Sequence, residues 1–239
     1  MKKNILVVFP MVYEAKPVFA KFAKGKKAKV GEVADISVES SGFDIRALVS
    51  GFGCAASQNR IRLAVEKFRP DWVILAGYCG ACRPGISAGD LLLDSSCGEL
   101  PPELKSALGA LDFKVGKIAT TSGIAEADMK ADLNASGYAG VELEASIVRE
   151  TLKELGVRPV FSHMRWVSDA SDCLMPMQFF ADIMDFSCGE IKVSCAALVR
   201  SLLRNPREFV ELCRYAKALS PVQKRYSEEI VRIVGALRG

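Results

Sequence analysis

The hydrophobic positions of the chain form short apolar runs that alternate with segments of helical spacing. The clearest runs, Ile5–Phe9 (ILVVF) and Trp72–Ala76 (WVILA), are rich in β-branched residues and predict buried strands. Further strands are predicted over 43–50, 90–93, 115–120, 138–143 and 157–167. Helical spacing predicts helices over 15–24, 54–68 and 144–155, and over 195–203, 207–219 and 221–237.

This alternation predicts an α/β fold, because strands that alternate with helices form mostly parallel sheets covered on both faces. We expect a three-layer α/β/α sandwich with a mostly parallel, mixed central sheet. No internal repeat or linker divides the chain, so residues 1–239 are predicted to form a single domain. Ligands bind at the carboxyl ends of strands in such sheets. That rule places one crevice at segments 9–14, 51–54, 77–81, 143–144 and 168–172.

The composition is that of a globular protein, with half of the 239 residues hydrophobic and a quarter charged. No apolar run approaches the roughly 20 residues that a membrane span needs. The N-terminal apolar segment is short and lacks a small-residue cleavage site, so we expect a cytoplasmic protein. The eight cysteines are scattered and there is one histidine, which favours free thiols and gives a closed zinc site little support. Cys79 and Cys82 form a C-x-x-C, for which a redox pair is the alternative. We expect no metal and no cofactor.

The positive charge is concentrated in residues 199–239, which hold nine basic and four acidic residues. We therefore describe 195–239 as a basic helical C-terminal tail within the domain. A solvated basic face on a packed helix explains it, and peripheral contact with an anionic membrane is the sharper alternative. Nucleic-acid binding is not supported, since the basic residues are not interleaved with aromatic ones. Four apolar residues just upstream could line a substrate channel or pack in the core: Met175, Met177, Phe179 and Phe180.

Glycine pairs end two of the predicted strands, at Gly51 and Gly53 and at Gly77 and Gly80. Glycine at a strand end allows a tight turn or a close approach to a ligand. Neither pair belongs to a G-x-G-x-x-G motif, and no phosphate-binding G-x-x-x-x-G-K-[ST] occurs, so a dinucleotide or nucleoside triphosphate site is not indicated. A plain turn would explain either pair alone. Two pairs at one predicted crevice favour a ligand site.

Acidic residues also gather at strand ends, at Glu14, Glu142, Glu144 and Asp169. Alternation places Glu142 and Glu144 on one face of their strand for as long as the strand lasts. Other interpretations stay open from the local pattern. Glu144 could be an ordinary acid in a first helical turn, as could Asp172, and Ser168 could be an N-cap.

Four blocks, in order, carry a resemblance to a known family. They are ILVVFPMVYEAKP from Ile5, WVILAGYCGACRPGISAGDLLLDS from Trp72, GVELEASIV from Gly140 and MRWVSDASD from Met164. Together they resemble the purine nucleoside phosphorylase and nucleosidase superfamily. The likeness is greatest to methylthioadenosine/S-adenosylhomocysteine nucleosidases and to hopanoid-associated phosphorylases. The resemblance implies cleavage of the N-glycosidic bond of a purine, adenine-type nucleoside, with the free base as a product.

The resemblance also implies catalytic roles for Asp169, Glu14 and Arg165. Asp169 would protonate N7 of the departing purine, with Ser168 holding it, and burial would have to raise its pKa for this. Glu14 would orient and deprotonate the attacking water, and Arg165 would line the same place. The transition state of such a cleavage is oxocarbenium-like, so the departing base must be stabilised as it gains charge.

The remaining substrate contacts come from two blocks. Glu144 would accept hydrogen bonds from the ribose 2′- and 3′-hydroxyls. Leu143 takes the place of the usual methionine under the sugar. The glycine-rich block would add Gly77, Tyr78 and Gly80 to the substrate-binding residues, although Tyr78 replaces the usual serine or threonine.

Water or inorganic phosphate could be the co-substrate. Phosphorylases hold phosphate with arginines and backbone amides, yet the first turn here has an anion, Glu14, and no arginine. Water is therefore favoured, although Arg46, Arg60 and Arg165 could still contact phosphate. A phosphorylase, including one acting on an adenosyl-lipid, and a non-catalytic nucleoside-binding protein are the alternatives. By resemblance we expect a homo-oligomer, a dimer.

Overall fold

The computed structural model describes residues 2–109, 111–173 and 206–239, together with 184–185, 190–191, 196, 199 and 203. The four apolar residues proposed as a channel, from Met175 to Phe180, lie outside the described residues. Most of the helix predicted over 195–203 also lies outside them.

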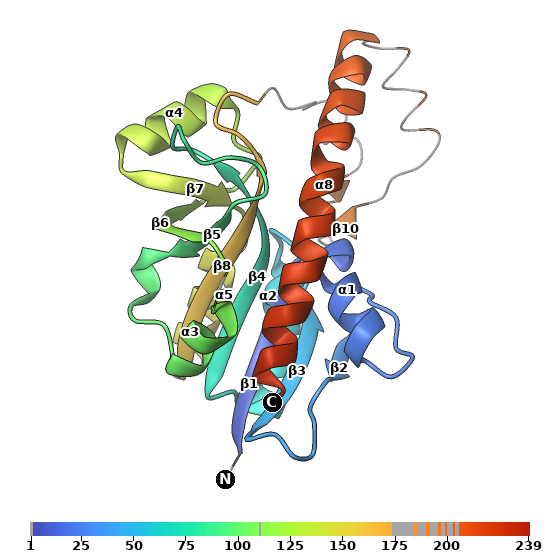
Figure 1. The fold of residues 1–239 in the computed structure, drawn as a ribbon, viewed down its shortest axis with the longest axis vertical. Helices are drawn as coiled ribbons and strands as arrows, with labels where there is room; N and C mark the ends of the chain where they lie inside the picture. Colours follow the sequence, from blue (N-terminus) through green and yellow to red (C-terminus); the bar gives the residue numbers. More distant parts are fainter. Residues whose placement is uncertain are drawn as a thin grey trace.

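A mixed eight-stranded sheet forms the centre of the molecule (Figure 1). Its strands run in the order β2-β3-β1-β4-β7-β6-β5-β8. Their bounds are β1 Lys3–Phe9, β2 Val33–Asp35, β3 Phe43–Val49, β4 Trp72–Ala81, β5 Leu91–Asp94, β6 Phe113–Thr120, β7 Tyr138–Glu142 and β8 Val160–Asp169. Separately, β9 (Met184–Asp185) pairs antiparallel with β10 (Glu190–Ile191).

One half of the sheet closes on itself, because β8 pairs both with β5 and with β4. The pairing of β4 with β8 is parallel and runs from Trp72 to Gly80, with a register shift after Cys79. Past that shift, Gly80 pairs antiparallel with Val141 of β7. The long strand β4 therefore joins the open half of the sheet to the closed half, and its carboxyl end lies beside those of β7 and β8.

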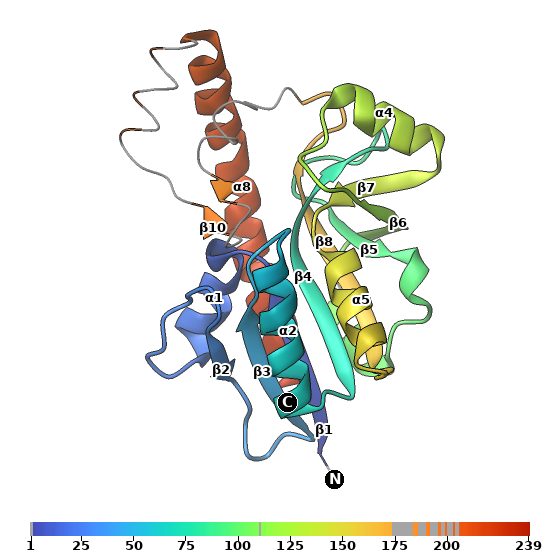
Figure 2. The ribbon, with the colours of Figure 1, turned by 180° about the vertical axis from the view of Figure 1, so that it is seen from behind.

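Helices cover both faces of the sheet, which confirms the predicted α/β fold. On one face lie α1 (Val12–Phe22), α3 (Pro102–Leu108) and the long α8 (Pro206–Leu237) (Figure 1). The opposite face is covered by α2 (Ala55–Phe68) and α5 (Ala145–Glu154) (Figure 2). Alternate residues of β1 serve the two layers: Ile5 and Val7 pack toward α1 and α8, while Leu6 and Val8 pack toward α2 and α5.

The C-terminal segment differs from its prediction. Two helices separated before Pro221 were expected, but α8 is one helix of 32 residues with Pro221 inside it. A proline inside a helix removes a hydrogen bond and clashes with the preceding turn. The helix continues because one apolar stripe runs through the proline, and the residues of this stripe that are buried in the core are Val222, Tyr226, Ile230, Ile233, Val234 and Leu237.

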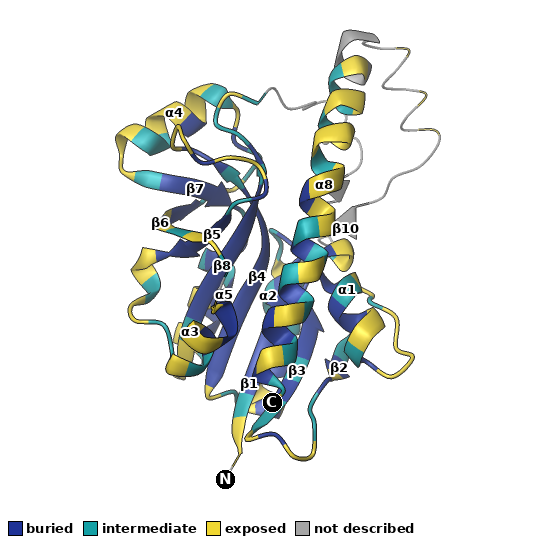
Figure 3. Ribbon diagram, in the orientation of Figure 1, coloured by how far each residue is buried: buried dark blue, intermediate teal, exposed yellow. Residues whose placement is uncertain are grey.

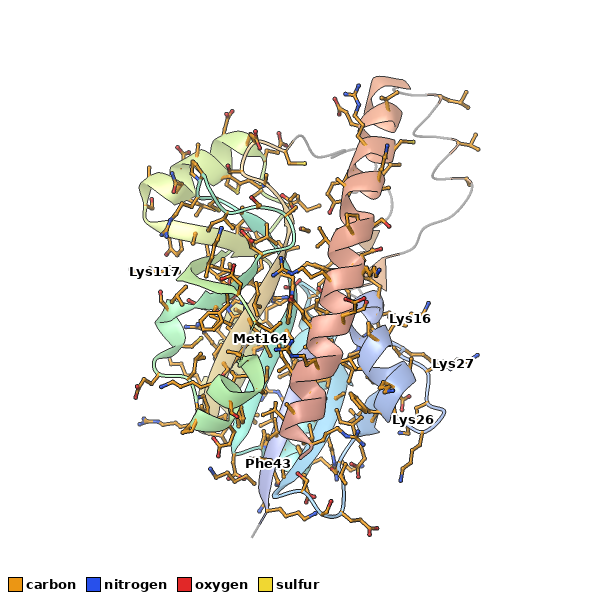
Figure 4. The ribbon with its side chains drawn as sticks, viewed as in Figure 1. Lys16, Lys26, Lys27, Phe43, Lys117 and Met164 are labelled. Carbon is orange, nitrogen blue, oxygen red and sulfur yellow. The ribbon has the colours of Figure 1, made fainter. Side chains whose placement is uncertain are left out.

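The two ends of α8 therefore have different surroundings. Residues 222–237 pack on the sheet, whereas residues 210–221 are largely exposed (Figure 3). No described helix is long and apolar enough to cross a membrane. Charged side chains elsewhere on the surface point into solvent. Lys16, Lys26, Lys27 and Lys117 point outward, whereas Met164 lies within the core (Figure 4).

Two α-helices, α3 and α4 (Ala127–Ala135), and three short strands, β2, β9 and β10, were not predicted. β2 is only three residues long, and α4 has no apolar stripe, since Lys130 is its one buried residue. Without hydrophobic periodicity, such elements leave no signal in the sequence.

Because the C-terminal half of α8 is part of the core, Ile230→Ala should lower the free energy of unfolding by about 2–5 kcal/mol. Arg232→Ala, two residues away on the exposed side, is the matched control and should change it by at most about 0.5 kcal/mol. Chemical denaturation followed by circular dichroism measures both. An Ile230→Ala variant as stable as the control would mean that α8 is not packed as described.

Candidate active site

A cavity of about 770 Å³, part of it open to solvent, lies at the carboxyl ends of β4, β7 and β8. This size suits a small-molecule ligand. Its lining residues come from the first turn of α1, from these strand ends, from the loop before α4, from α4 and from α8. They are Met11, Tyr13, Tyr78, Cys79, Gly80, Thr121, Gly123, Ile124, Ala125, Lys130, Val141, Glu142, Leu143, Glu144, Ser168, Asp169, Tyr215 and Leu219.

Arg165, in the middle of β8, is the charged centre beneath this cavity and is fully buried. Its Nη2 donates to Glu142 Oε2 at 2.5 Å and to Glu144 Oε2 at 2.9 Å. Its Nε donates to His163 Nε2 at 2.9 Å. The third nitrogen, Nη1, has no hydrogen-bond partner in the part of the chain that the structure describes. Burial would lower the pKa of Arg165, but Glu142, Glu144 and Glu14 outweigh this and raise it, so the guanidinium stays charged.

A second row of polar groups orients Arg165 from behind. Since Arg165 Nε donates to His163 Nε2, the histidine must carry its proton on Nδ1, which lies 3.1 Å from Asp94 Oδ2. Burial lowers the pKa of His163, which fits a neutral ring. Asp94 also accepts from Arg149 Nη2 at 2.9 Å. The guanidinium is thus held by a chain of partners that reaches the surface at Arg149.

Glu142 forms the shorter of the two ion pairs of Arg165. Its carboxylate also accepts from the Thr120 hydroxyl at 2.5 Å and from the backbone N–H groups of Glu144 and Ala145 at 3.0–3.1 Å. Burial opposes its ionisation, yet Arg165 and these hydrogen bonds lower the pKa of Glu142 to about 2. Glu142 is therefore a fixed anion, and it organises the turn that leads into α5.

Glu144 faces the cavity, and the net effect of its surroundings on its pKa is opposite to that for Glu142. Burial, together with the nearby Glu142 and Glu14, raises its pKa in spite of Arg165. One oxygen, Oε2, accepts from Arg165 at the floor of the cavity that the Glu144 side chain lines. Leu143 lines the cavity beside it. A carboxyl group anchored in this way can accept hydrogen bonds from ligand hydroxyls.

Glu14 is fully buried at the start of α1. Its Oε2 accepts from the backbone N–H of Met11 at 2.7 Å, and its Oε1 accepts from that of Tyr78 at 2.8 Å. Burial raises its pKa to about 7, against the lowering effect of Arg165 and of the two N–H groups. A carboxyl group that titrates near neutrality is suited to act as a general base.

Gly77 separates Glu14 from Arg165. A Cβ atom at this position would collide with Glu14 Oε1 and with Arg165 Nη1. Glycine is therefore required here because the two charged groups occupy the space where a side chain would lie. The same geometry places the unpartnered Nη1 and the Glu14 carboxyl group against one Cα atom.

Aromatic rings hold the first turn of α1 against β4. The Tyr78 ring stacks on Tyr13 with a centroid separation of 5.7 Å and lies 4.7 Å from the ring of Tyr226 of α8. The Tyr226 hydroxyl donates to the backbone oxygen of Glu14 at 2.8 Å. Trp166 of β8 packs edge-on against Tyr226 at 4.9 Å. α8 therefore fixes the position of Glu14.

Asp169 ends β8 on the far side of the cavity. The Ser168 hydroxyl lies 2.5 Å from Asp169 Oδ1 and 3.1 Å from the carbonyl oxygen of Cys79. The other oxygen, Oδ2, accepts from the ammonium group of Lys130, which also donates to the backbone oxygen of Ala170 at 3.0 Å. A Cβ atom on Gly80 would lie 3.0 Å from Asp169 Oδ2 and 3.1 Å from Lys130 Cε, so glycine leaves room for this pair.

The structure brings the predicted site residues together around one cavity and its floor. Glu144, Leu143, Ser168, Tyr78, Gly80 and Asp169 line it, and Glu14, Arg165 and Gly77 lie directly beneath. Arg165 was expected to line the site, but it lies beneath the residues that line the cavity and is surrounded by buried partners. Ser168 is part of β8 and caps no helix, and Asp172 lies in an exposed turn.

The predicted phosphate contacts are not assembled here. Arg46 lies over the ring of Phe68 at 4.3 Å, and Arg60 donates to the backbone oxygen of Ser50 at 2.9 Å. Both line a separate hollow between β3 and α2. Cys79 and Cys82 are free thiols whose pKa values are raised by burial. No group of three or more potential metal ligands is arranged to hold a metal within the described residues.

Sequence reasoning missed four contributors: Lys130, His163, Tyr215 and Tyr226. His163 could have been found, because it lies two residues before Arg165 on the same strand and so shares its face. Lys130 had no such signal, since its helix was not predicted. Tyr215 and Tyr226 were part of predicted helices, but only the packing of α8 shows that they reach the site.

No family profile matches the chain, and no curated protein matches its sequence. Solved structures do match over almost the whole chain. A 5′-methylthioadenosine/S-adenosylhomocysteine nucleosidase from Colwellia psychrerythraea, in complex with adenine, has a TM-score of 0.61 at 17% identity and covers 99% of this chain and 96% of its own. The chain has the nucleosidase fold.

Two further structures agree. The corresponding nucleosidase from Neisseria meningitidis, in complex with methylthio-immucillin-A, has a TM-score of 0.62 at 16% identity, covering 97% of this chain and 98% of its own. Futalosine hydrolase of Helicobacter pylori has a TM-score of 0.62 at 14% identity, covering 98% and 97%. The resemblance carried by the four sequence blocks is thus confirmed as a likeness of fold.

Replacing Glu14 by glutamine tests its raised pKa. The folded-state value of about 7, against the usual 4.5, means that the folded protein holds one more proton between these pH values. This carboxyl group therefore makes the free energy of unfolding fall as the pH rises from about 4.5 to about 7, by about 3 kcal/mol. Denaturant unfolding at several pH values should show that extra fall in the wild type and not in Glu14→Gln. Parallel pH dependences in the two proteins would mean that Glu14 ionises as an ordinary carboxyl group.

Proposed function

We propose that this protein hydrolyses the N-glycosidic bond of a purine, adenine-type nucleoside and releases the free base. The observation that supports this most is Glu14, a buried carboxyl group with a pKa of about 7 beside the unpartnered Nη1 of Arg165. A hydrogen-bond donor and a general base on either side of Gly77 are what is needed to hold a water molecule and take its proton. The nucleosidase fold agrees with this chemistry.

In the proposed reaction the ribose lies over Leu143 with its 2′- and 3′-hydroxyls at Glu144. The carboxyl group of Glu144 accepts from the hydroxyls, while Arg165 fixes its Oε2. As the bond to the base breaks, positive charge develops on the sugar, and the carboxyl groups of Glu144 and Glu14 lie close enough to stabilise it. Asp169, across the cavity, faces the purine.

Phosphorolysis is the second candidate, and the site supports it less. A bound phosphate needs cationic or amide donors directed at it. Of the two arginines besides Arg165 that could have supplied them, Arg46 is held over an aromatic ring and Arg60 is hydrogen-bonded to a backbone oxygen, both in another hollow. Glu14 would repel the anion once ionised. A carboxyl group in the nucleophile position favours water.

The proposal extends to partners. The matching nucleosidases were solved with adenine and with methylthio-immucillin-A, so an adenosine-type substrate with an apolar 5′ group is the first to test. Residues 210–221 of α8 are largely exposed and carry Arg214 and Lys217. This surface is available for the homodimer contact or for the membrane contact that the sequence suggested.

Base release from methylthioadenosine, S-adenosylhomocysteine and adenosine, with and without phosphate, tests the proposal. We expect free adenine from at least one of them in phosphate-free buffer, with no stimulation by phosphate, because Glu14 activates water. Chromatography of the products at fixed times measures it. Absence of base release from all three would contradict the proposed enzyme, and release only in the presence of phosphate would make it a phosphorylase.

A further inference from the structure

We propose that Lys130 supplies, through Asp169, the proton that the departing purine takes up. This rests on the proposed hydrolysis and assigns a role to a residue outside the four sequence blocks. In this scheme Asp169 contacts the base, and Lys130 of α4 contacts Asp169.

The burial of Lys130 is the first observation. It is 1% exposed, and it is the one buried lysine among the described residues. Its neighbour Met129 is 45% exposed, so α4 turns a charged side chain inward and an apolar one outward. Burying an ammonium group costs free energy even when it is paired. Packing alone does not favour a helix that buries its lysine and exposes its methionine. The position of α4 is therefore explained by the role of Lys130 in the site.

The hydrogen bonds of Asp169 are the second observation. Both of its oxygens accept, Oδ1 from the Ser168 hydroxyl and Oδ2 from the Lys130 ammonium. The Ser168 hydroxyl also lies within reach of the Cys79 carbonyl oxygen, so Lys130 is the one cationic donor on Asp169 among the described residues. Its ammonium group lines the same cavity, in direct contact with the carboxyl group that would face the purine.

The other titratable groups around this pair do not compete for the role. They come from β4 and the residue after it (Cys79 and Cys82), from the segment after β8 (Asp172 and Cys173) and from α8 (Tyr215). Burial raises the pKa of each of the three thiols and of the tyrosine, which keeps them neutral around pH 7. Asp172 is exposed. Among these neighbours, Lys130 is the one cationic group in contact with Asp169.

The proposed step conserves atoms, electrons and charge. A proton passes from Lys130 Nζ to the Asp169 carboxylate and on to N7 of the purine, leaving a neutral amine. The electron pair of the C1′–N9 bond goes to the base. Water adds its oxygen to C1′ and gives its proton to Glu14. Solvent then returns a proton to Lys130 and removes one from Glu14, so the net reaction is nucleoside plus water giving base plus ribose.

The test compares Lys130→Met with the wild type by kcat/KM for base release across the pH range. Methionine has nearly the length of lysine but neither charge nor proton. At neutral and alkaline pH we expect a loss of about 100-fold or more, the usual contribution of general acid catalysis. At acid pH the loss should shrink, because protons from solvent can then replace the proton that Lys130 supplies. A ratio of the two proteins that is constant with pH, or a loss below about 10-fold, would overturn the proposal.

Two control variants make the comparison specific. Lys114→Met removes another lysine that pairs with an aspartate, Asp90, away from the cavity, and should leave kcat/KM unchanged. Asp169→Asn cannot relay a proton and should lose activity at every pH. Circular dichroism and thermal unfolding report whether each variant is folded.

The proposed function and this inference are contradicted by different results. If the wild type released no base at all, the proposed function would be contradicted. If the wild type released base and Lys130→Met had the same kcat/KM, only this inference would be contradicted.

Discussion

The buried guanidinium of Arg165 is the interaction on which the rest of the site depends. One positive charge meets three carboxyl groups, those of Glu142, Glu144 and Glu14. Glu142 takes that charge, because it also accepts from Thr120 and from two backbone N–H groups. Burial raises the pKa values of Glu144 and Glu14, and Arg165 only partly offsets this rise. Burial and a single cation thus divide three acids into one permanent anion, Glu142, and two carboxyl groups with raised pKa values, that of Glu14 being about 7.

The fold supports this arrangement from both sides of the sheet. Behind Arg165, His163 and Asp94 fix the orientation of the guanidinium. In front, α8 crosses the sheet and places Tyr226 against the first turn of α1, which holds Glu14. The closure of β4, β7 and β8 then brings Asp169 and Lys130 to the opposite wall. The Glu14 carboxyl group therefore lies at one side of the cavity and the ion pair of Asp169 with Lys130 at the other, and the proposed hydrolysis would place the sugar between them.

The sequence predicted the parts that follow from strand ends. Glu14, Glu144 and Asp169 each come directly after an apolar run, and the carboxyl ends of parallel strands meet at one edge, so their meeting could be expected. The closure of the sheet could not, since it depends on the antiparallel pairing of β4 with β7. Lys130 owes its place to that closure and belongs to a helix with no apolar stripe. Pro221 suggested a helix boundary that the apolar stripe of α8 overrides, because burying that stripe outweighs the local cost of proline.

The central claim is that Glu14 takes a proton from water within the Arg165 cluster. The most direct measurement is the pH dependence of kcat/KM for base release in phosphate-free buffer. Glu14 must be ionised to act, so the account predicts activity that falls as the pH drops through about 7, the pKa that burial gives this group. A Glu14→Gln variant should lack this limb, with low residual activity. Activity that requires phosphate, or an acid limb unchanged in Glu14→Gln, would contradict the account.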